Sequence, residues 1–203
     1  ANRGEIAVRI ARAADEVGLE SVAVYTKADQ LALHPLAATL AIELDAGSSG
    51  ADPVAAYLDP AALVRIAVET ECDCVHPGYG FLSENAEFAR LCAEAGLAFV
   101  GPSPEALALF GDKVGARALA ESIGVPVIHG TESLSSSEAA FGALADVGYP
   151  VMLKGAAGGG GRGMRVVTSD SEMAEAFDRC SSEALASFGN ATLFLERRIE
   201  RPR

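Results

Sequence analysis

"YPVMLKGAAGGGGRGMRVV", residues 149–167, is the stretch that decides how the second half of this chain folds. The apolar runs on either side of the glycines are typical of two short β-strands. Only a short loop joins them, whereas parallel strands need a crossover of about a dozen residues or more. The stretch therefore predicts an antiparallel hairpin. Lys154 lies at the end of its first strand, and Arg162 and Arg165 add positive charge beyond the loop.

The glycines themselves indicate a phosphate-binding loop. Glycine N–H groups are unobstructed by side chains, so such a loop can close over phosphate oxygens within reach of the Lys154 ammonium. It is not a Walker A loop, because no G-K-[ST] follows and no helix opens directly after it. It is not a dinucleotide-binding fingerprint either, because a hairpin replaces the strand-to-helix turn. The alternative is a flexible linker or a long hairpin turn, which is the usual role of glycine-rich segments.

The composition indicates a soluble, acidic globular protein. Half of the 203 residues are hydrophobic, and the formal net charge of −12 argues against nucleic acid as the main partner. Among the four scattered cysteines, Cys72-Asp73-Cys74 comes nearest to a metal motif but lacks the ligand spacing of structural zinc sites. No stretch reaches the roughly 18 apolar residues of a membrane span, and no secretory signal is visible. These features favour a cytoplasmic protein with reduced thiols, not bound to a membrane.

Residues 1–110 alternate between helical and strand-like segments. Helices are predicted at residues 5–17, 59–71 and 85–96, and strands at residues 21–26, 72–77 and 97–101. Asp59 is expected to cap its helix ahead of Pro60. This alternation predicts a Rossmann-like, doubly wound α/β domain with a parallel sheet.

A second unit, of α+β type, is predicted to begin near residue 111. Helices are expected at residues 112–124 and 136–148, each ended by a glycine. Strands are expected at residues 125–129, 149–154, 164–167 and 191–197, so that the glycine-rich hairpin belongs to this second sheet.

Six motifs resemble the biotin carboxylase component of biotin-dependent carboxylases, which are ATP-grasp enzymes. They are "ANRGEIAVRIARAA", "HPGYGFLSENAEFA", "GPSPEALALFGDKVGAR", "GVPVIHG", the glycine-rich stretch and "FLERRIERPR". The motifs occur in the family's order and extend over the whole chain. Two further stretches, "PVAAYLD" and "SEALASFGNATLFLER", are similar to the pyruvate carboxylase and acyl-CoA carboxylase α-chain types.

The resemblance implies a ligase that uses ATP to carboxylate carrier-bound biotin with bicarbonate, through carboxyphosphate. It implies ATP, Mg²⁺ or Mn²⁺, and biotin on a carrier domain as cofactors. The partners implied are bicarbonate, a biotin carboxyl carrier protein or domain, and a carboxyltransferase unit, in an oligomer of the full-length protein. The glycine loop would be a lid that opens for nucleotide exchange and closes to exclude water. The final carboxyl acceptor, pyruvate or an acyl-CoA, is not readable from this sequence.

The resemblance also divides the chain and limits its expected activity. Residues 1–110 match the family's N-terminal (preATP-grasp) domain without its first strand, and residues 111–203 match an ATP-grasp domain truncated at its C-terminus. The magnesium ligands and the residues that orient bicarbonate and biotin are expected after Arg203, so no metal ligand and no catalytic residue is assigned within the chain. Without those ligands the phosphates lack full charge compensation, and residues 1–203 alone are expected not to turn over.

The binding residues are carried over from these motifs. Those implied to bind ATP are Lys113, Lys154, Gly158, Gly159, Gly160, Gly161, Gly163, Met164, Glu196, Arg197, Arg198 and Ile199. The two lysines would contact phosphates, Met164 would pack on adenine, and residues 196–199 would bind the adenine edge largely through backbone atoms. A loop with Tyr79, Gly80 and Glu84 would face the biotin and bicarbonate side.

Other interpretations stay open for these residues. Without the resemblance, Lys113 reads as a solvated helix lysine, Met164 as a core residue, and residues 196–203 as an exposed charged strand and turn. His76 is expected to be structural. The alternative functions are another ATP-grasp carbon–nitrogen ligase, of the carbamoyl-phosphate or purine-pathway kind, and a non-catalytic nucleotide-binding fragment.

Overall fold

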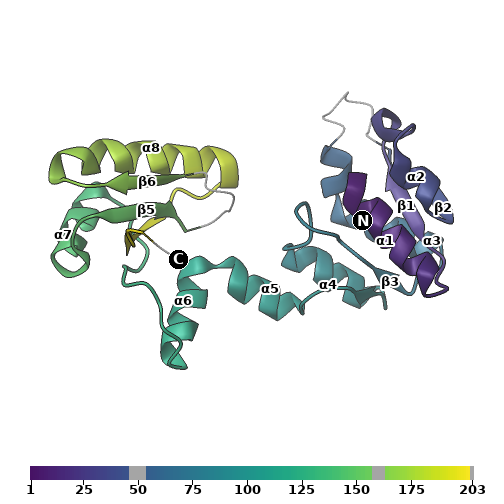
Figure 1. Ribbon diagram of the computed structural model, residues 1–203, viewed down its shortest axis with the longest axis horizontal. Helices are drawn as coiled ribbons and strands as arrows, with labels where there is room; N and C mark the ends of the chain where they lie inside the picture. Colours follow the sequence, from purple (N-terminus) through teal and green to yellow (C-terminus); the bar gives the residue numbers. More distant parts are fainter. Residues whose placement is uncertain (46–53, 157–162, 202–203) are drawn as a thin grey trace. The chain divides into compact units, whose positions relative to one another are not determined.

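The computed structural model describes residues 1–45, 54–156 and 163–201 and divides the chain into two compact units, Ala1–Ala108 and Leu109–Arg203 (Figure 1). Both units are mixtures of helices and strands. In the part of the chain that is described, no helix combines the length and apolarity that crossing a bilayer requires.

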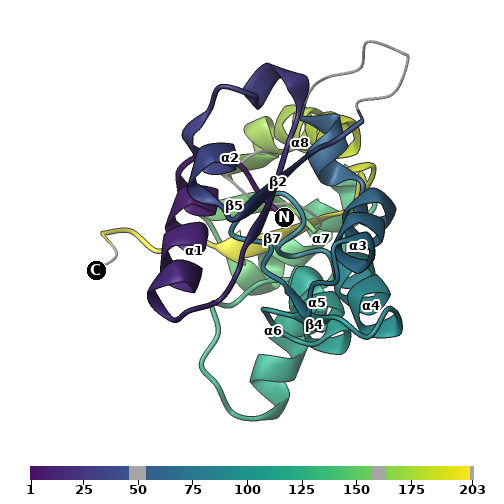
Figure 2. The same cartoon turned by 90° about the vertical axis from the view of Figure 1, so that its right-hand side faces the viewer.

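Short strands and helices alternate in the first unit. Its helices are α1 (Gly4–Glu16), α2 (Leu33–Ala37), α3 (Pro60–Glu69) and α4 (Ala86–Glu94), its strands are β1 (Val22–Tyr25), β2 (Leu40–Glu43), β3 (Cys74–Val75) and β4 (Ala98–Phe99), and its 3₁₀ turns are η1 (Lys27–Asp29) and η2 (Ala55–Leu58). Figure 2 shows α1 with α2, and α3 with α4, as neighbouring pairs of helices. Helix α5 (Pro104–Gly111) follows β4 and leads into the second unit.

Both strand pairs of the first unit are parallel, as the predicted α/β class requires. The described strands nevertheless form two separate two-stranded sheets, β1-β2 and β3-β4. Strand β3 keeps only two of the six residues predicted for it. It stops there because Pro77 has no N–H to donate and Gly78, at φ +70°, turns the chain away.

Helices α3 and α4 begin at side-chain caps and bury one face. Asp59 accepts a hydrogen bond from the Ala62 N–H at 3.0 Å, which confirms the predicted cap, and Asn85 does the same for Phe88 at 2.7 Å. The core of this unit includes Tyr57, Leu63, Ile66, Val75, Phe88 and Cys92.

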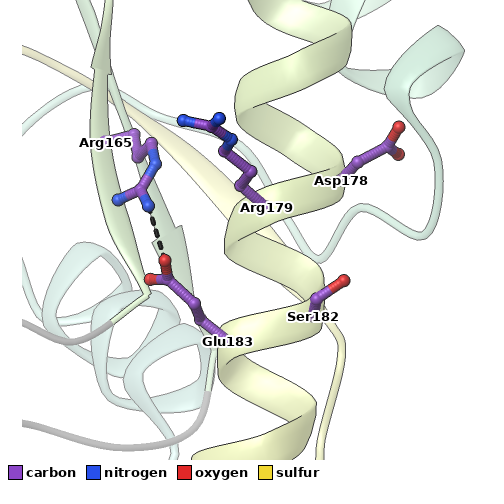
Figure 3. A pocket seen from close by; sticks show the side chains of 5 residues that line it. All are labelled: Arg165, Asp178, Arg179, Ser182 and Glu183. Carbon is purple, nitrogen blue, oxygen red and sulfur yellow. Dashed lines mark hydrogen bonds and ion pairs between the residues drawn. The ribbon is translucent and has the colours of Figure 1, made fainter.

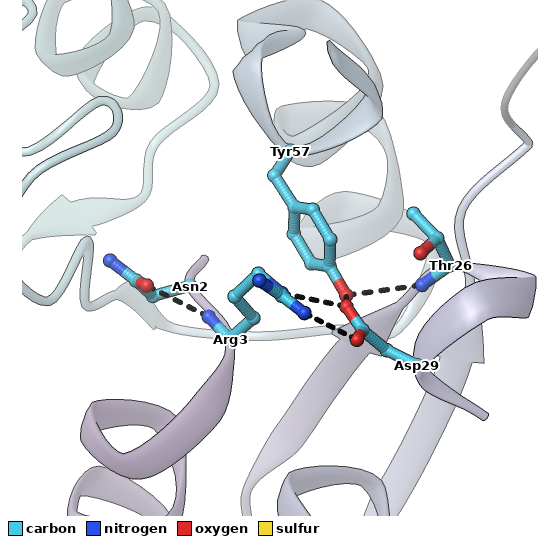
Figure 4. A network of polar contacts seen from close by, with 5 residues as sticks. All are labelled: Asn2, Arg3, Thr26, Asp29 and Tyr57. Carbon is cyan, nitrogen blue, oxygen red and sulfur yellow. Dashed lines mark hydrogen bonds and ion pairs between the residues drawn. The ribbon is translucent and has the colours of Figure 1, made fainter. Parts of the chain in front are cut away.

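A polar network fixes the start of α1 against β1 and η1 (Figure 4). The Arg3 guanidinium donates to both Asp29 carboxylate oxygens, at 2.7 and 2.5 Å. The Tyr57 hydroxyl donates to Asp29 at 2.8 Å and accepts from the Thr26 N–H at 3.1 Å. Asp29 is buried, and the hydrogen bond from Arg3 holds the pKa of its carboxyl below the ordinary value although burial opposes this. The ionised carboxylate is therefore the centre of the network.

An antiparallel three-stranded sheet forms the middle of the second unit. Strand β5 (Val151–Gly155) lies between β6 (Met164–Val167) and β7 (Leu193–Arg197). Helix α6 (Lys113–Ser122) opens the unit, and α7 (Ser137–Val147) and α8 (Asp170–Phe188) share a core with the sheet. Figure 1 shows α8 lying along β5 and β6.

The glycine-rich hairpin is confirmed. β5 and β6 pair antiparallel from Val151↔Val167 to Lys154↔Met164, and the Gly155 N–H donates to the Gly163 carbonyl at 3.1 Å. The strand predicted at residues 125–129 is wrong. This run contains Pro126, which has no N–H for a ladder, and the chain joins β7 only through isolated bridges at Gly130↔Glu196 and Leu134↔Leu193.

Asp29→Asn is predicted to lower the free energy of unfolding by about 2 kcal/mol at pH 7, since a hydrogen bond to a charged group contributes about 1.5–3 kcal/mol. The folded pKa of Asp29 is depressed. Its contribution is thus present above the unfolded pKa of about 3.9 and is lost as the pH falls through the folded value. Urea unfolding of both proteins should show a difference that shrinks between pH 7 and pH 3. Asp73→Asn, at an exposed position, is the control. An equal difference at both pH values would contradict the prediction.

Candidate functional site

Alternation along β5 gives the second sheet one covered face and one open face. Val151 and Leu153 are fully buried against the helices, so Met152 and Lys154 point to the opposite side. Their register partners on that side are Val166 and Met164 of β6 and Glu196 and Phe194 of β7. The open face therefore carries a lysine and a carboxylate among apolar side chains.

Lys154 and Glu196 form an ion pair on this open face. The Lys154 ammonium donates to a carboxylate oxygen of Glu196, and the two side chains are 26% and 17% exposed. Salt and water therefore screen this pair less than they would screen a fully exposed pair. It holds the Lys154 ammonium at the sheet surface, where the sequence predicts a phosphate contact.

Lys113 reaches the same region from the first turn of α6. The Asp112 side chain caps this helix by accepting from the Val114 N–H at 3.1 Å. Burial lowers the pKa of Lys113, the positive charge of Lys154 lowers it further, and Glu196 opposes both. Two lysines thus lie within electrostatic reach of one carboxylate, beside the positive end of a helix dipole. This excess of positive charge suits an anion such as a phosphate group.

Apolar side chains of the open face provide a platform beside these charges. Met164 is 37% exposed and lies opposite Lys154 in the register, and Val166 is 38% exposed. Met164 is therefore accessible to a ligand, which fits contact with a flat ring better than the alternative of a core residue.

A cleft of about 650 Å³ opens along β7 and the residues that follow it. Its lining includes Ile128, Met152, Lys154 and the predicted segment from Glu196 to Ile199. Two backbone donors of this segment already have partners, because Arg197 N–H donates to His129 O and Arg198 N–H donates to Pro150 O, at 2.8 and 2.9 Å. The edge of an adenine ring would therefore form hydrogen bonds with other backbone groups of the segment.

The glycine loop lies mostly outside the described residues, and this applies to Gly158, Gly159, Gly160 and Gly161. Gly163 is described. It is buried, has φ +65° and accepts the hydrogen bond that closes the base of the hairpin. The loop thus begins and ends next to Lys154 and Met164.

Arg165 adds positive charge beyond the loop, as the sequence indicates, but it does not share the face of Lys154. Its register partner is Leu153, so strand alternation sends its side chain to the covered face. There it donates to Glu183 of α8 at 2.5 Å. Figure 3 shows this pair in a second, open cleft of about 490 Å³, lined also by Asp178, Arg179 and Ser182. Its mixed charges do not add to the positive excess around Lys113 and Lys154.

The predicted loop of the first unit is held by a buried asparagine. Asn2 Nδ2 donates to the carbonyl oxygens of Pro77 and Tyr79, at 2.8 and 2.9 Å. Tyr79 is exposed and its hydroxyl donates to Glu5, while Gly80 and Glu84 are also exposed. The loop therefore presents its three predicted residues at the surface. His76 Nδ1 accepts from the Gly78 N–H at 3.0 Å, which is a structural role.

No group of three or more His, Cys, Asp or Glu side chains that could hold a metal ion occurs within residues 1–45, 54–156 and 163–201. Lys113 and Lys154 could hold phosphate oxygens but not a divalent cation.

Two family models match the chain. The model of the biotin carboxylase N-terminal domain matches residues 1–107, and that of the carbamoyl-phosphate synthase L chain ATP-binding domain matches residues 112–203. Mouse mitochondrial pyruvate carboxylase is 50% identical over 204 residues, an alignment that covers 100% of this chain. The chain spans only 17% of that protein's length.

Solved structures resemble the chain closely. A Campylobacter jejuni biotin carboxylase complex with βγ-ATP has a TM-score of 0.93 and 42% identity, covering 100% of this chain and 45% of that one. The biotin carboxylase domain dimer of Hydrogenobacter thermophilus 2-oxoglutarate carboxylase, with MgADP, ADP and bicarbonate, has a TM-score of 0.92 and 40% identity. That match covers 98% of this chain and 43% of the other.

Gly78→Ala is predicted to destabilise the protein more than Gly80→Ala. Both glycines have positive φ, at +70° and +62°, so both changes meet the backbone cost of about 1–2 kcal/mol. A Cβ at Gly78 would lie 2.7 Å from Asn2 Nδ2, whereas a Cβ at Gly80 meets nothing within 4 Å. Displacing Asn2 leaves buried polar groups unpaired, which adds about 1–3 kcal/mol. Urea unfolding of both variants measures the difference, and equal losses would contradict it.

Proposed function

Since the chain belongs to the biotin carboxylase family, we propose that the protein uses ATP to carboxylate carrier-bound biotin with bicarbonate. The observation that carries this proposal is that Lys113 of α6 lies near Lys154 on the open sheet face, close enough for the charge of Lys154 to lower its pKa. They are two of only three lysines in a chain with a net charge of −12. Positive charge is therefore concentrated where a polyphosphate would lie.

Each group of the site then has a role in binding. Bound ATP supplies the phosphoryl group that activates bicarbonate for attack by biotin. Lys154 and Lys113 would hold its phosphate oxygens, and the N-terminus of α6 would add its dipole. Met164 would pack on the adenine ring, and residues 196–199 would bind its edge. Glu196 keeps Lys154 oriented on the sheet face through their ion pair.

The solved relatives support this assignment. The Campylobacter jejuni structure contains an ATP-type ligand, and the Hydrogenobacter thermophilus structure contains MgADP and bicarbonate. For the glycine loop we propose the role of a lid over the phosphates, which the closed hairpin base at Gly155 and Gly163 supports. For Tyr79, Gly80 and Glu84 we propose the biotin and bicarbonate side, supported by their exposure.

The remaining assignments follow from the family. We propose that residues 1–110 form its N-terminal domain and residues 111–203 the first part of an ATP-grasp domain, with magnesium ligands on residues after Arg203. A biotin carrier, a carboxyltransferase unit and an oligomeric full-length protein are proposed with them. A cytoplasmic location is also proposed, supported by the free thiols of all four cysteines.

Another ATP-grasp ligase is the second candidate. It is favoured by the match of residues 112–203 to a family named after carbamoyl-phosphate synthase. ADP release by the full-length protein separates the two functions, because only a biotin carboxylase requires biotin together with bicarbonate. ADP release that ignores biotin would favour the second candidate.

Lys154→Ala is predicted to weaken ATP binding by the full-length protein roughly ten- to hundredfold. A charged phosphate contact contributes about 1.5–3 kcal/mol, and every 1.4 kcal/mol is about tenfold in affinity. Calorimetric titration with ATP measures the change. Lys27→Ala removes the same charge at an exposed position in η1 and is the matched control. Unchanged affinity in Lys154→Ala would show that this lysine does not contact the nucleotide.

Residues 1–203 alone are predicted to show no bicarbonate-dependent ATP hydrolysis. The described residues hold the two lysines for which we propose phosphate contacts but no cluster of metal ligands, so the charge of the phosphates would be only partly compensated. The measurement is ADP release with bicarbonate and free biotin, with the full-length protein as positive control. Sustained turnover by residues 1–203 would refute the prediction.

A further inference from the structure

Helix α6 carries Lys113 to the site but has little hydrophobic attachment of its own. None of its residues, from Lys113 to Ser122, is buried. Helices in proteins are usually held by a buried apolar face, so a different contact must fix this one. Its position matters because Lys113 lies on its first turn.

Arg117 supplies that contact. Its guanidinium donates to the Gly130 carbonyl at 3.0 Å and approaches the Thr131 carbonyl at 3.4 Å. The Arg117 side chain is only 15% exposed. Residues four apart lie on the same side of a helix, so Lys113 and Arg117 both point from α6 toward the sheet.

The chain opposite Arg117 has no room for a side chain. A Cβ on Gly130 would lie 2.3 Å from the Leu195 carbonyl oxygen and 2.5 Å from Arg117 Nη1. Glycine at this position thus allows both the guanidinium and β7 to lie close to the same stretch of backbone.

Gly130 also connects Arg117 to the ion pair of the site. It forms an antiparallel bridge with Glu196, the residue that pairs with Lys154. The neighbouring Thr131 N–H donates to the Leu195 carbonyl at 2.8 Å. A short sequence of direct contacts therefore leads from α6 through Arg117 and Gly130 to Glu196 and Lys154.

We propose that Arg117 is a positioning residue, which clamps α6 onto Gly130 so that Lys113 stands beside Lys154 for binding the ATP phosphates. This inference rests on the proposed function of the site. The described hydrogen bonds of Arg117 go to Gly130, Thr131 and Glu121, none of which is on the open sheet face. It acts on the nucleotide only through the place it gives to Lys113.

Glu121, a further partner of Arg117, provides a matched control. Glu121 lies 3.2 Å from the same guanidinium, but its side chain is 52% exposed and it lies on α6 itself. Such a pair within one helix contributes little and cannot tie the helix to the sheet. Glu121→Gln therefore removes an interaction of Arg117 without releasing the clamp.

Steady-state kinetics of the full-length protein test the proposal. Arg117→Met should raise the KM for ATP about tenfold, because a misplaced lysine loses its charge-assisted contact. The kcat at saturating ATP and the KM for bicarbonate should stay within about twofold. Arg117→Lys keeps the charge but lacks the planar guanidinium that donates to two carbonyls, so its KM for ATP should be intermediate. Glu121→Gln should behave as wild type. An unchanged KM for ATP in Arg117→Met would overturn the proposal. So would a change of similar size in the KM for ATP, the kcat and the KM for bicarbonate.

Lysine labelling without nucleotide tests the clamp independently of activity. The pH dependence of Lys113 modification by a limiting amine reagent, read by peptide mass spectrometry, gives its apparent pKa. Burial lowers this pKa in the folded protein, so Arg117→Met should raise it toward the ordinary lysine value of about 10.4. No change would overturn the clamp. If the protein shows no ATP-dependent activity, the proposed function fails, and labelling alone then decides the role of Arg117.

Discussion

The alternation of side chains along β5 is the constraint on which the site depends. Val151 and Leu153 are fully buried against α7 and α8. A shift of one residue in the pairing would expose both of them and turn Lys154 into the core. The cost of burying an unpaired charge makes that alternative inaccessible. Packing on the covered face therefore determines which side chains reach the open face, although no core residue touches the site.

The open face also carries a local excess of positive charge. The chain is acidic overall, yet Lys113 and Lys154 lie close enough for one charge to lower the pKa of the other. Such a pair is unfavourable unless an anion compensates it. Glu196 compensates only part of the charge, and the helix dipole of α6 adds to the excess. The excess of positive charge fits the proposal that this face binds a ligand with several negative charges.

Local signals made part of this structure predictable from the sequence. The short loop required an antiparallel hairpin, and Asp59 before Pro60 marked the start of α3. Helix α8 was not predicted, although its buried residues Met173, Ala176, Phe177, Cys180 and Ala184 follow helical spacing. Arg165 was considered only for its charge, and strand alternation assigns its side chain to the face of Leu153. Arg117 was not predicted either, since its partners are backbone carbonyls that carry no sequence signal.

Hydrogen bonds from a side chain to backbone carbonyls hold both the loop around Gly78 and helix α6, which carry predicted binding groups. Asn2 donates to the carbonyls of the loop around Gly78, and Arg117 donates to the carbonyl of Gly130. In each case a Cβ on the glycine would collide with the side chain that donates. Surface loops and lightly packed helices cannot be fixed by a hydrophobic core, because their polar backbone must stay hydrated or bonded. A polar side chain from another element provides hydrogen bonds to those carbonyls and also fixes the position of the loop or helix. The precision of the site thus rests on side chain to backbone hydrogen bonds, while the fold rests on the cores beneath them.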